Sequence, residues 1–134
     1  MRQETDPQPK IKMISKILIA EEAHTADLLA SIFKAHLKGV VTECASHEDT
    51  IALIENPKEE ISLVITNFGR GENPPGKIIQ ELVTKLRPGL PVLILTGGFI
   101  DLTDFHPENI MRKPFENEAF IKRVTELICS PGPK

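Results

Sequence analysis

The sequence contains no tryptophan and no tyrosine, and its aromatic residues are six phenylalanines. Surfaces that stack nucleic-acid bases depend on aromatic rings, so this chain has little material for one. The net charge of −3 also argues against nucleic acid as the main partner, because nucleic-acid-binding domains carry basic surfaces. We therefore expect a partner of another class.

Cysteine is scarce as well, since only Cys44 and Cys129 occur. The longest apolar runs, such as residues 17–20 and 92–95, are far shorter than the roughly 20 residues that span a bilayer as a helix. Residues 1–13 are polar and lack the apolar stretch of a secretory signal. These absences predict a cytoplasmic chain with no membrane partner, in which both thiols stay reduced. We expect Cys44 to pack within a strand.

The 134 residues fit one ordinary domain. Apolar residues make up 40% and charged residues 26% of the chain, which is typical of a soluble globular protein. We expect flexible tails at residues 1–12 and 130–134, with a single domain at residues 13–129 between them.

Strand and helix patterns alternate along this domain. Short apolar runs predict strands at residues 14–20, 40–44, 61–66, 92–96 and 110–112. Apolar residues at helical spacing predict helices at residues 21–37, from 47 to before Pro57, from Pro75 or Gly76 to 86, and at 115–129. Such alternation predicts a doubly wound α/β domain with a five-stranded, mainly parallel sheet.

Ligands of such sheets bind at the carboxyl ends of the strands. The residues found there are Glu21, Glu22, Asn67, Thr96, Gly97, Lys113 and Pro114. Taken singly, most have an ordinary interpretation. Glu21 and Glu22, for example, are favourable acids in the first turn of a helix, and only their joint placement suggests a site.

A phosphate-binding loop is a second candidate, because Gly71, Gly76 and Lys77 match most of that motif between a strand and a helix. The motif ends in Ser or Thr, whose hydroxyl binds Mg²⁺, and Ile78 cannot replace it. Two prolines in the loop also lack the N–H groups that bind phosphate. These departures argue against the alternative of a nucleotide-binding function, and a loop that starts a helix is the simpler interpretation.

Four segments in series, "KILIAEEAHTADLL", "SLVITNFGRG", "PVLILTGG" and "MRKPF", resemble the receiver domains of two-component response regulators. The resemblance runs from about residue 16 to about residue 128 and implies a flavodoxin-like fold. It implies that Glu21 and Glu22 stand where an acidic pair holds Mg²⁺. It also implies that Thr96 and Lys113 stand where side chains contact the phosphoryl group, with the bond from Lys113 to Pro114 typically cis.

Three departures from the family's pattern meet in this pocket. The resemblance places Asn67 at the phosphate-accepting Asp, and a neutral amide is too poor a nucleophile to form a comparable phosphoryl adduct. The longer Glu side chains do not suit the strict octahedral geometry of Mg²⁺, so we expect weak or absent binding. The segment between Thr96 and Lys113 has room for one or two helical turns instead of a full fourth helix, and Ile110 replaces the family's switch aromatic.

The sequence thus predicts a degenerate receiver domain, or pseudo-receiver, that is not an enzyme, needs no cofactor and acts in signal transduction by phosphorylation-independent protein binding. We expect a fixed pocket held by a contact of Lys113 with Glu22 or Asn67. One alternative is a phosphorelay component that docks a histidine kinase or phosphotransfer partner. A structural or dimerising module is another.

Overall fold

The computed structural model describes residues 15–97 and 105–129 of the chain. The tails predicted at residues 1–12 and 130–134 lie outside the described residues, as does most of the segment predicted to replace the fourth helix. The two described ranges include every predicted strand and helix apart from Ile14.

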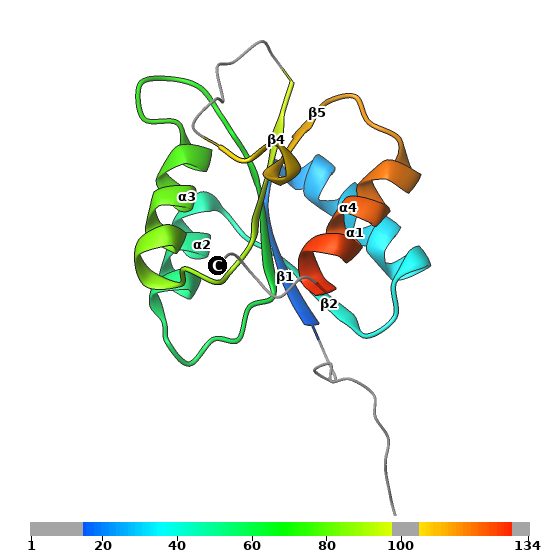
Figure 1. Ribbon diagram of the computed structural model, residues 1–134, viewed down its shortest axis with the longest axis horizontal. Helices are drawn as coiled ribbons and strands as arrows, with labels where there is room; N and C mark the ends of the chain where they lie inside the picture. The colour runs from blue at the N-terminus through cyan, green and yellow to red at the C-terminus, as the bar shows by residue number, and fades with distance from the viewer. Residues whose placement is uncertain (1–14, 98–104, 130–134) are drawn as a thin grey trace, which may run out of the picture.

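Strands and helices alternate along the described chain, as predicted (Figure 1). The strands are β1 (Ser15–Ala20), β2 (Val40–Cys44), β3 (Leu63–Asn67), β4 (Val92–Thr96) and β5 (Ile110–Arg112). The helices are α1 (Ala23–His36), α2 (His47–Glu55), α3 (Pro75–Leu86) and α4 (Asn117–Cys129), with a 3₁₀ turn, η1 (Pro107–Asn109), before β5. The boundaries differ from the prediction by one or two residues: β3 begins two residues later and ends one later, α1 begins two residues later and ends one earlier, and α4 begins two residues later.

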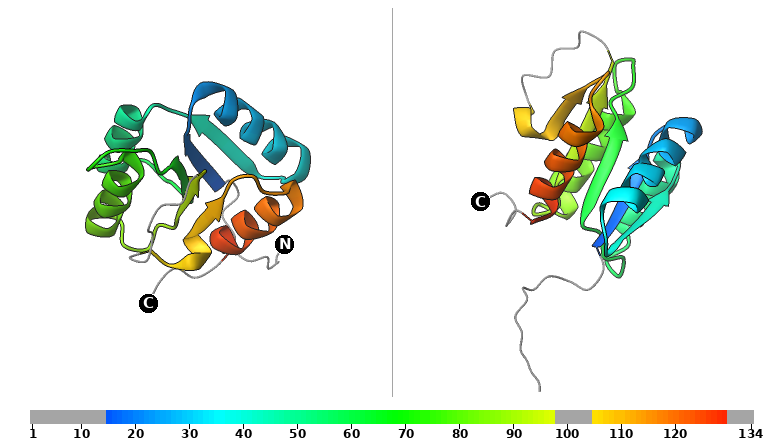
Figure 2. Two further views of the ribbon diagram at one scale, coloured as in Figure 1. Left: turned by 90° about the horizontal axis from the view of Figure 1, so that it is seen from above. Right: turned by 90° about the vertical axis from the view of Figure 1, so that its right-hand side faces the viewer.

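The five strands form one parallel sheet in the order β2-β1-β3-β4-β5. Helices α1 and α4 cover one face of the sheet, and α2 and α3 cover the other (Figures 1 and 2). This arrangement confirms the predicted doubly wound, flavodoxin-like architecture. Because all strands run the same way, their carboxyl ends lie along one edge of the molecule.

Each face of the sheet has its own apolar core. Strands β1, β3 and β4 are central, and their side chains alternate between the two faces. On one face, Ile17, Ile65 and Leu93 pack with residues of α1 and α4, where Phe33 stacks on Phe120. On the other face, strand residues pack under α2 and α3. Burial on both faces explains why these strands appear in the sequence as continuous apolar runs.

Cys44 does not pack in the core, which corrects the prediction. The residue is exposed at the end of β2. Strand β2 is an edge strand, and none of its residues is fully buried. The last residue of such a strand stays open to solvent because no neighbouring strand covers its outer side.

Arg87, just after α3, joins two elements in a way that the sequence did not predict. Its guanidinium donates hydrogen bonds to the carbonyl oxygens of Ile54 (2.9 Å), Glu59 (2.8 Å) and Asn56 (2.6 Å). The last carbonyl groups of a helix have no partner within the helix. Arg87 therefore caps α2 and the loop that follows it, and fixes α2 beside α3.

Candidate functional site

The sheet brings the predicted strand-end residues to one edge. Glu21 directly follows β1, Asn67 ends β3, Thr96 ends β4 and Lys113 directly follows β5. Register pairs β1 with β3 and β3 with β4 up to these ends, since Ala20 aligns with Thr66 and Asn67 with Leu95. The sequence prediction that these residues share one end of neighbouring strands is thus correct.

Lys113 forms an ion pair with Glu21. Its Nζ lies 2.9 Å from Glu21 Oε2, and the Glu21 side chain is only 1% exposed, against 34% for Lys113. The contact is one of charge rather than of a well-oriented hydrogen bond, because Oε2 has no partner of hydrogen-bond geometry among the described residues. The other oxygen, Oε1, accepts a bond of 3.2 Å from the N–H of Glu22. The ammonium group of Lys113 is thus the main group that compensates the negative charge of the nearly buried Glu21 carboxylate.

The partner of Lys113 corrects the prediction, which named Glu22 or Asn67. Glu22 is exposed and is the N-cap of α1, where its side chain accepts a hydrogen bond from the N–H of Thr25. That backbone hydrogen bond lowers the pKa of the Glu22 carboxyl, and the charges of His24 and Lys113 act in the same direction. The two glutamates therefore have different roles, one in the pocket and one at the helix terminus.

Asn67 and Thr96 end their strands at the same edge of the sheet and take no part in the ion pair. Asn67 is half-buried, and no side-chain hydrogen bond links it to another described residue. Thr96 is 1% exposed, and its hydroxyl likewise lacks a partner within the described part of the chain. The Thr96 carbonyl accepts a bond of 2.7 Å from the N–H of Lys113, and the peptide bond from Lys113 to Pro114 is cis. The strand ends thus carry an amide and a hydroxyl that have no partner among the described residues, in addition to the ion pair between Lys113 and Glu21.

The loop before α3 does not form a phosphate cradle. The N–H of Gly76 donates to the carbonyl of Phe68 at 2.9 Å, and the N–H groups of Lys77 and Ile78 both donate to the carbonyl of Pro74. Gly76 also lies so close to the end of β3 that an added Cβ would sit 2.6 Å from the Cα of Phe68. Its glycine is thus explained by close packing, and the N–H groups at the start of α3, which a phosphate loop would direct at its ligand, already bond within the chain.

The described part of the segment after β4 contains one 3₁₀ turn and no α-helix. Phe105 packs edge-on against Phe68, with ring centroids 6.0 Å apart. Asn109 in η1 donates a hydrogen bond of 2.8 Å to the carbonyl of Val92. Residues 105–109 therefore pack beside the ends of β3 and β4 without forming an α-helix. Ile110, at the predicted switch position, is half-buried at the start of β5.

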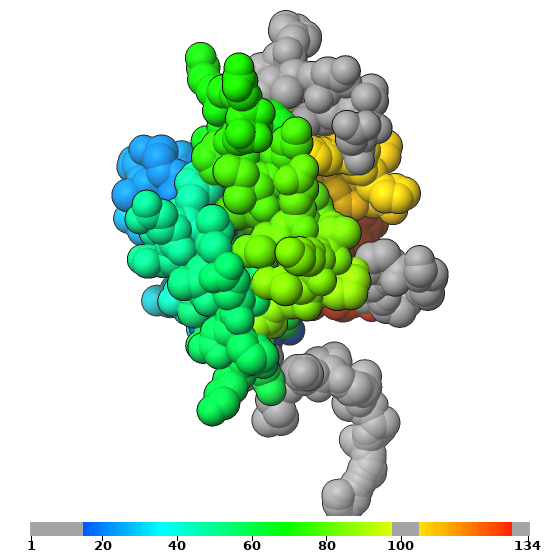
Figure 3. All heavy atoms as spheres, turned by 90° about the vertical axis from the view of Figure 1, so that its left-hand side faces the viewer, coloured from blue at the N-terminus to red at the C-terminus, as the bar shows by residue number. Residues whose placement is uncertain are grey.

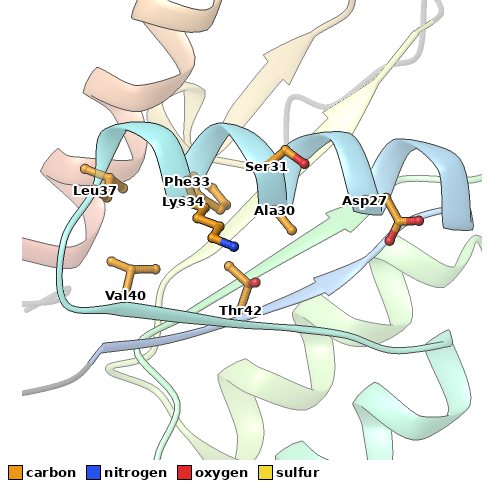
Figure 4. A pocket seen from close by; sticks show the side chains of 8 residues that line it. All are labelled: Asp27, Ala30, Ser31, Phe33, Lys34, Leu37, Val40 and Thr42. Atoms are coloured by element: carbon orange, nitrogen blue, oxygen red, sulfur yellow. The ribbon is translucent and has the colours of Figure 1, made fainter.

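A cavity of about 540 Å³ lies away from these strand ends, between α1 and the edge strand β2 (Figure 4). Its lining is Asp27, Ala30, Ser31, Phe33, Lys34, Leu37, Val40 and Thr42. Sequence reasoning missed this cavity because no motif marks the residues of the two elements that line it, and Phe33 among them belongs to the buried core.

The described residues were also compared with the requirements of a metal site and of a membrane-spanning helix. Within residues 15–97 and 105–129, no three His, Cys, Asp or Glu side chains gather in a way that could hold a metal ion. None of the helices in those ranges is long and apolar enough to cross a membrane.

Comparison with solved structures identifies the fold. A response regulator receiver protein from Sinorhizobium medicae WSM419 superposes with a TM-score of 0.73 at 19% identity, over 90% of this chain and 98% of that one. A receiver domain from Clostridium thermocellum gives 0.69 at 22% identity, over 86% and 94%. A receiver protein from Burkholderia phymatum gives 0.69 at 15% identity, over 90% and 99%.

No family model matches the sequence, and no curated protein matches it. The identities to the solved structures are low, so the likeness concerns the three-dimensional arrangement. On that evidence, the chain has the fold of CheY-like response regulator receiver domains.

Proposed function

We propose that this chain is a degenerate receiver domain that takes part in signal transduction without accepting a phosphoryl group. The observation that carries the proposal is the combination of Asn67 at the end of β3 with the ion pair between Lys113 and Glu21. The amide offers no anionic nucleophile. Lys113, the cation that would meet an incoming phosphoryl group, is already paired.

The side chains present do not fit the Mg²⁺ site of phosphate-accepting receivers. Mg²⁺ is bound through carboxylates and water in a strict octahedron. Asn67 is neutral, Glu22 is turned to the N-terminus of α1, and Glu21 is paired with Lys113. One partly neutralised carboxylate is a poor site, so we expect at most weak Mg²⁺ binding, no other cofactor and no enzymatic reaction.

The same ion pair supports a pocket with one fixed conformation. Separating Lys113 from Glu21 would leave a carboxylate that is almost fully buried without its cation, which is costly. No phosphorylation event is available to offset that cost. A pocket of this kind would present a constant surface to a protein partner, and control would come from the amount of the chain or of its partner.

The partner class that we propose is a signalling protein, and a histidine kinase or phosphotransfer domain is the first candidate. Docking to such a protein needs the surface of the fold and not the acceptor carboxylate. A net charge of −3 makes a nucleic-acid partner a weaker candidate.

The test is incubation of the full chain with a small phosphoryl donor, phosphoramidate, and Mg²⁺, followed by intact-mass spectrometry. We expect the chain to keep its mass. The matched control is Asn67→Asp, which replaces the side-chain amide with a carboxylate at the acceptor position. Addition of one phosphoryl group to the native chain would overturn the proposal. Addition to the variant alone would place the block at Asn67, and addition to neither would place a second block at the ion pair.

A further inference from the structure

Helix α3 carries a row of apolar side chains along its surface. Ile78, Leu82 and Leu86 recur at every fourth residue, so they lie one above another on one side of the helix. Ile78 is 40% exposed and Leu86 is 45% exposed. Only four large apolar side chains of the described residues are exposed to this degree, and two of them belong to this row.

The row is not the core face of α3. Gly76, Ile79 and Val83 are buried toward the sheet, and Leu82 only partly joins the core beneath the helix. Helix α3 lies at the surface, between α2 and the segment around residues 105–110 (Figure 3). Turning the helix to bury the row would expose the core face, so the described residues offer no rearrangement of α3 that covers it.

We propose that a second copy of this chain packs on the row, with the two α3 helices antiparallel about a two-fold axis. In that arrangement Leu82 meets its counterpart in the second copy, and Ile78 of each copy meets Leu86 of the other. The three apolar positions are symmetric about Leu82, and a two-fold interface requires such self-complementary patches.

The charges beside the row favour a second copy over an unrelated partner. Glu81 and Lys85 are exposed and lie on the same side of the row, each three residues after an apolar position. We call the line along which the two antiparallel helices meet the seam. Along it the charges follow in the order Lys85 of one copy, Glu81 of the second copy, Glu81 of the first and Lys85 of the second, at spacings of about 3 Å along the axis. Every carboxylate then has a cation beside it, and the seam is neutral. A strongly acidic or strongly basic partner would lack this match.

The size of the contact sets the strength to expect. A single helix pair buries less than the roughly 1,200–2,000 Å² of a standard stable interface. The dimer should therefore be weak, with a dissociation constant in the micromolar to millimolar range, and should form as the chain is concentrated.

The test is sedimentation equilibrium of the full chain from micromolar to millimolar concentration. We expect the average mass to rise toward that of a dimer. Replacing both exposed ends of the row, with Ile78→Ser and Leu86→Ser together, should weaken association by at least about tenfold, since 1.4 kcal/mol of lost apolar contact corresponds to that factor. Leu28→Ser removes another exposed leucine, 57% exposed on α1, and should leave the mass curve unchanged.

Charge reversal provides a second set of variants that keeps the apolar row intact. Glu81→Lys alone makes the seam wholly basic, and Lys85→Glu alone makes it wholly acidic, so each should weaken the dimer. The double reversal restores a neutral seam in which each carboxylate has a cation beside it, and it should restore association. A monomer at all concentrations, a dimer unaffected by the serine pair, equal weakening by Leu28→Ser, or no recovery in the double reversal would each overturn the proposal.

Discussion

Removal of Lys113 should destabilise the fold more than removal of its partner's charge. The substitution Lys113→Met keeps most of the aliphatic volume but leaves the Glu21 carboxylate, which is 1% exposed, without a cation. Breaking a buried pair in this way costs about 3–5 kcal/mol. Because Lys113 is 34% exposed, water already screens part of the interaction, and we expect the lower end, about 3 kcal/mol.

The reverse change should cost less. Glu21→Gln keeps the shape of the side chain and an oxygen that can accept the N–H of Glu22. Lys113 then keeps its charge but can turn toward water, so the expected loss is about 1 kcal/mol. The double variant Glu21→Gln with Lys113→Met no longer buries a lone charge. It should be about 2 kcal/mol more stable than the sum of the single losses predicts.

The assay is urea unfolding followed by far-ultraviolet circular dichroism, because a chain without tryptophan or tyrosine gives little intrinsic fluorescence signal. With a denaturant slope of about 2 kcal/mol per molar urea, Lys113→Met should lower the midpoint by about 1.5 M and Glu21→Gln by about 0.5 M. Equal losses in the two single variants, or simple additivity in the double variant, would show that the ion pair does not hold this pocket.

Four further changes follow from other contacts. Arg87→Ala should lower the free energy of unfolding by about 2–3 kcal/mol, because it uncaps several carbonyl oxygens, and Arg87→Lys should recover less than half of that loss in the same urea assay. Gly76→Ala should cost about 2 kcal/mol or more because its Cβ would meet backbone at 2.6 Å, whereas Gly89→Ala, with open space around it, should stay within about 0.5 kcal/mol. Thr96→Val removes a buried hydroxyl that has no partner among the described residues, so stability should stay equal or rise by about 1 kcal/mol; a clear loss would show that the hydroxyl is bonded. The capping hydrogen bond makes the pKa of Glu22 lower in the folded than in the unfolded chain, so its contribution is complete above the unfolded pKa of about 4.3, declines as the pH falls further and is lost only below the folded-state pKa; acid unfolding curves of the native chain and Glu22→Gln should therefore begin to approach each other below about pH 4.3 and converge only at more acidic pH.

The sequence was enough to predict the fold because the central strands are buried on both faces. Apolar runs such as residues 17–20 and 92–95 mark β1 and β4, and α3 begins where Pro75 and Gly76 predict. The errors lie at positions where burial is incomplete. Ile61 is half-buried and apolar but precedes β3, and Cys44 ends an edge strand that is never fully covered.

The placement of the site residues was also predictable, since parallel strands end at one edge. The pairing within the site was not. Glu21 and Glu22 are adjacent and identical in type, so nothing local in the sequence distinguishes them. The choice is made by the start of α1, where Glu22 acts as the cap although Ser, Thr, Asp and Asn are the usual cap residues. Arg87 could not be foreseen either, because its acceptors are backbone carbonyls of a distant helix end and loop.

The state of the pocket explains why Asn67→Asp is an informative variant and not only a control. The new carboxylate would lie at the end of β3, beside β1, the strand that leads to Glu21, whose side chain pairs with Lys113. Two neighbouring carboxylates repel each other, and both a metal cation and a shared Lys113 reduce that repulsion. If the variant binds Mg²⁺ and takes up phosphate, the rest of the pocket still has the geometry for that chemistry. If Lys113 stays on Glu21 and the variant remains unreactive, the ion pair alone is sufficient to keep the pocket closed, and any signalling role must depend on the surface of the domain.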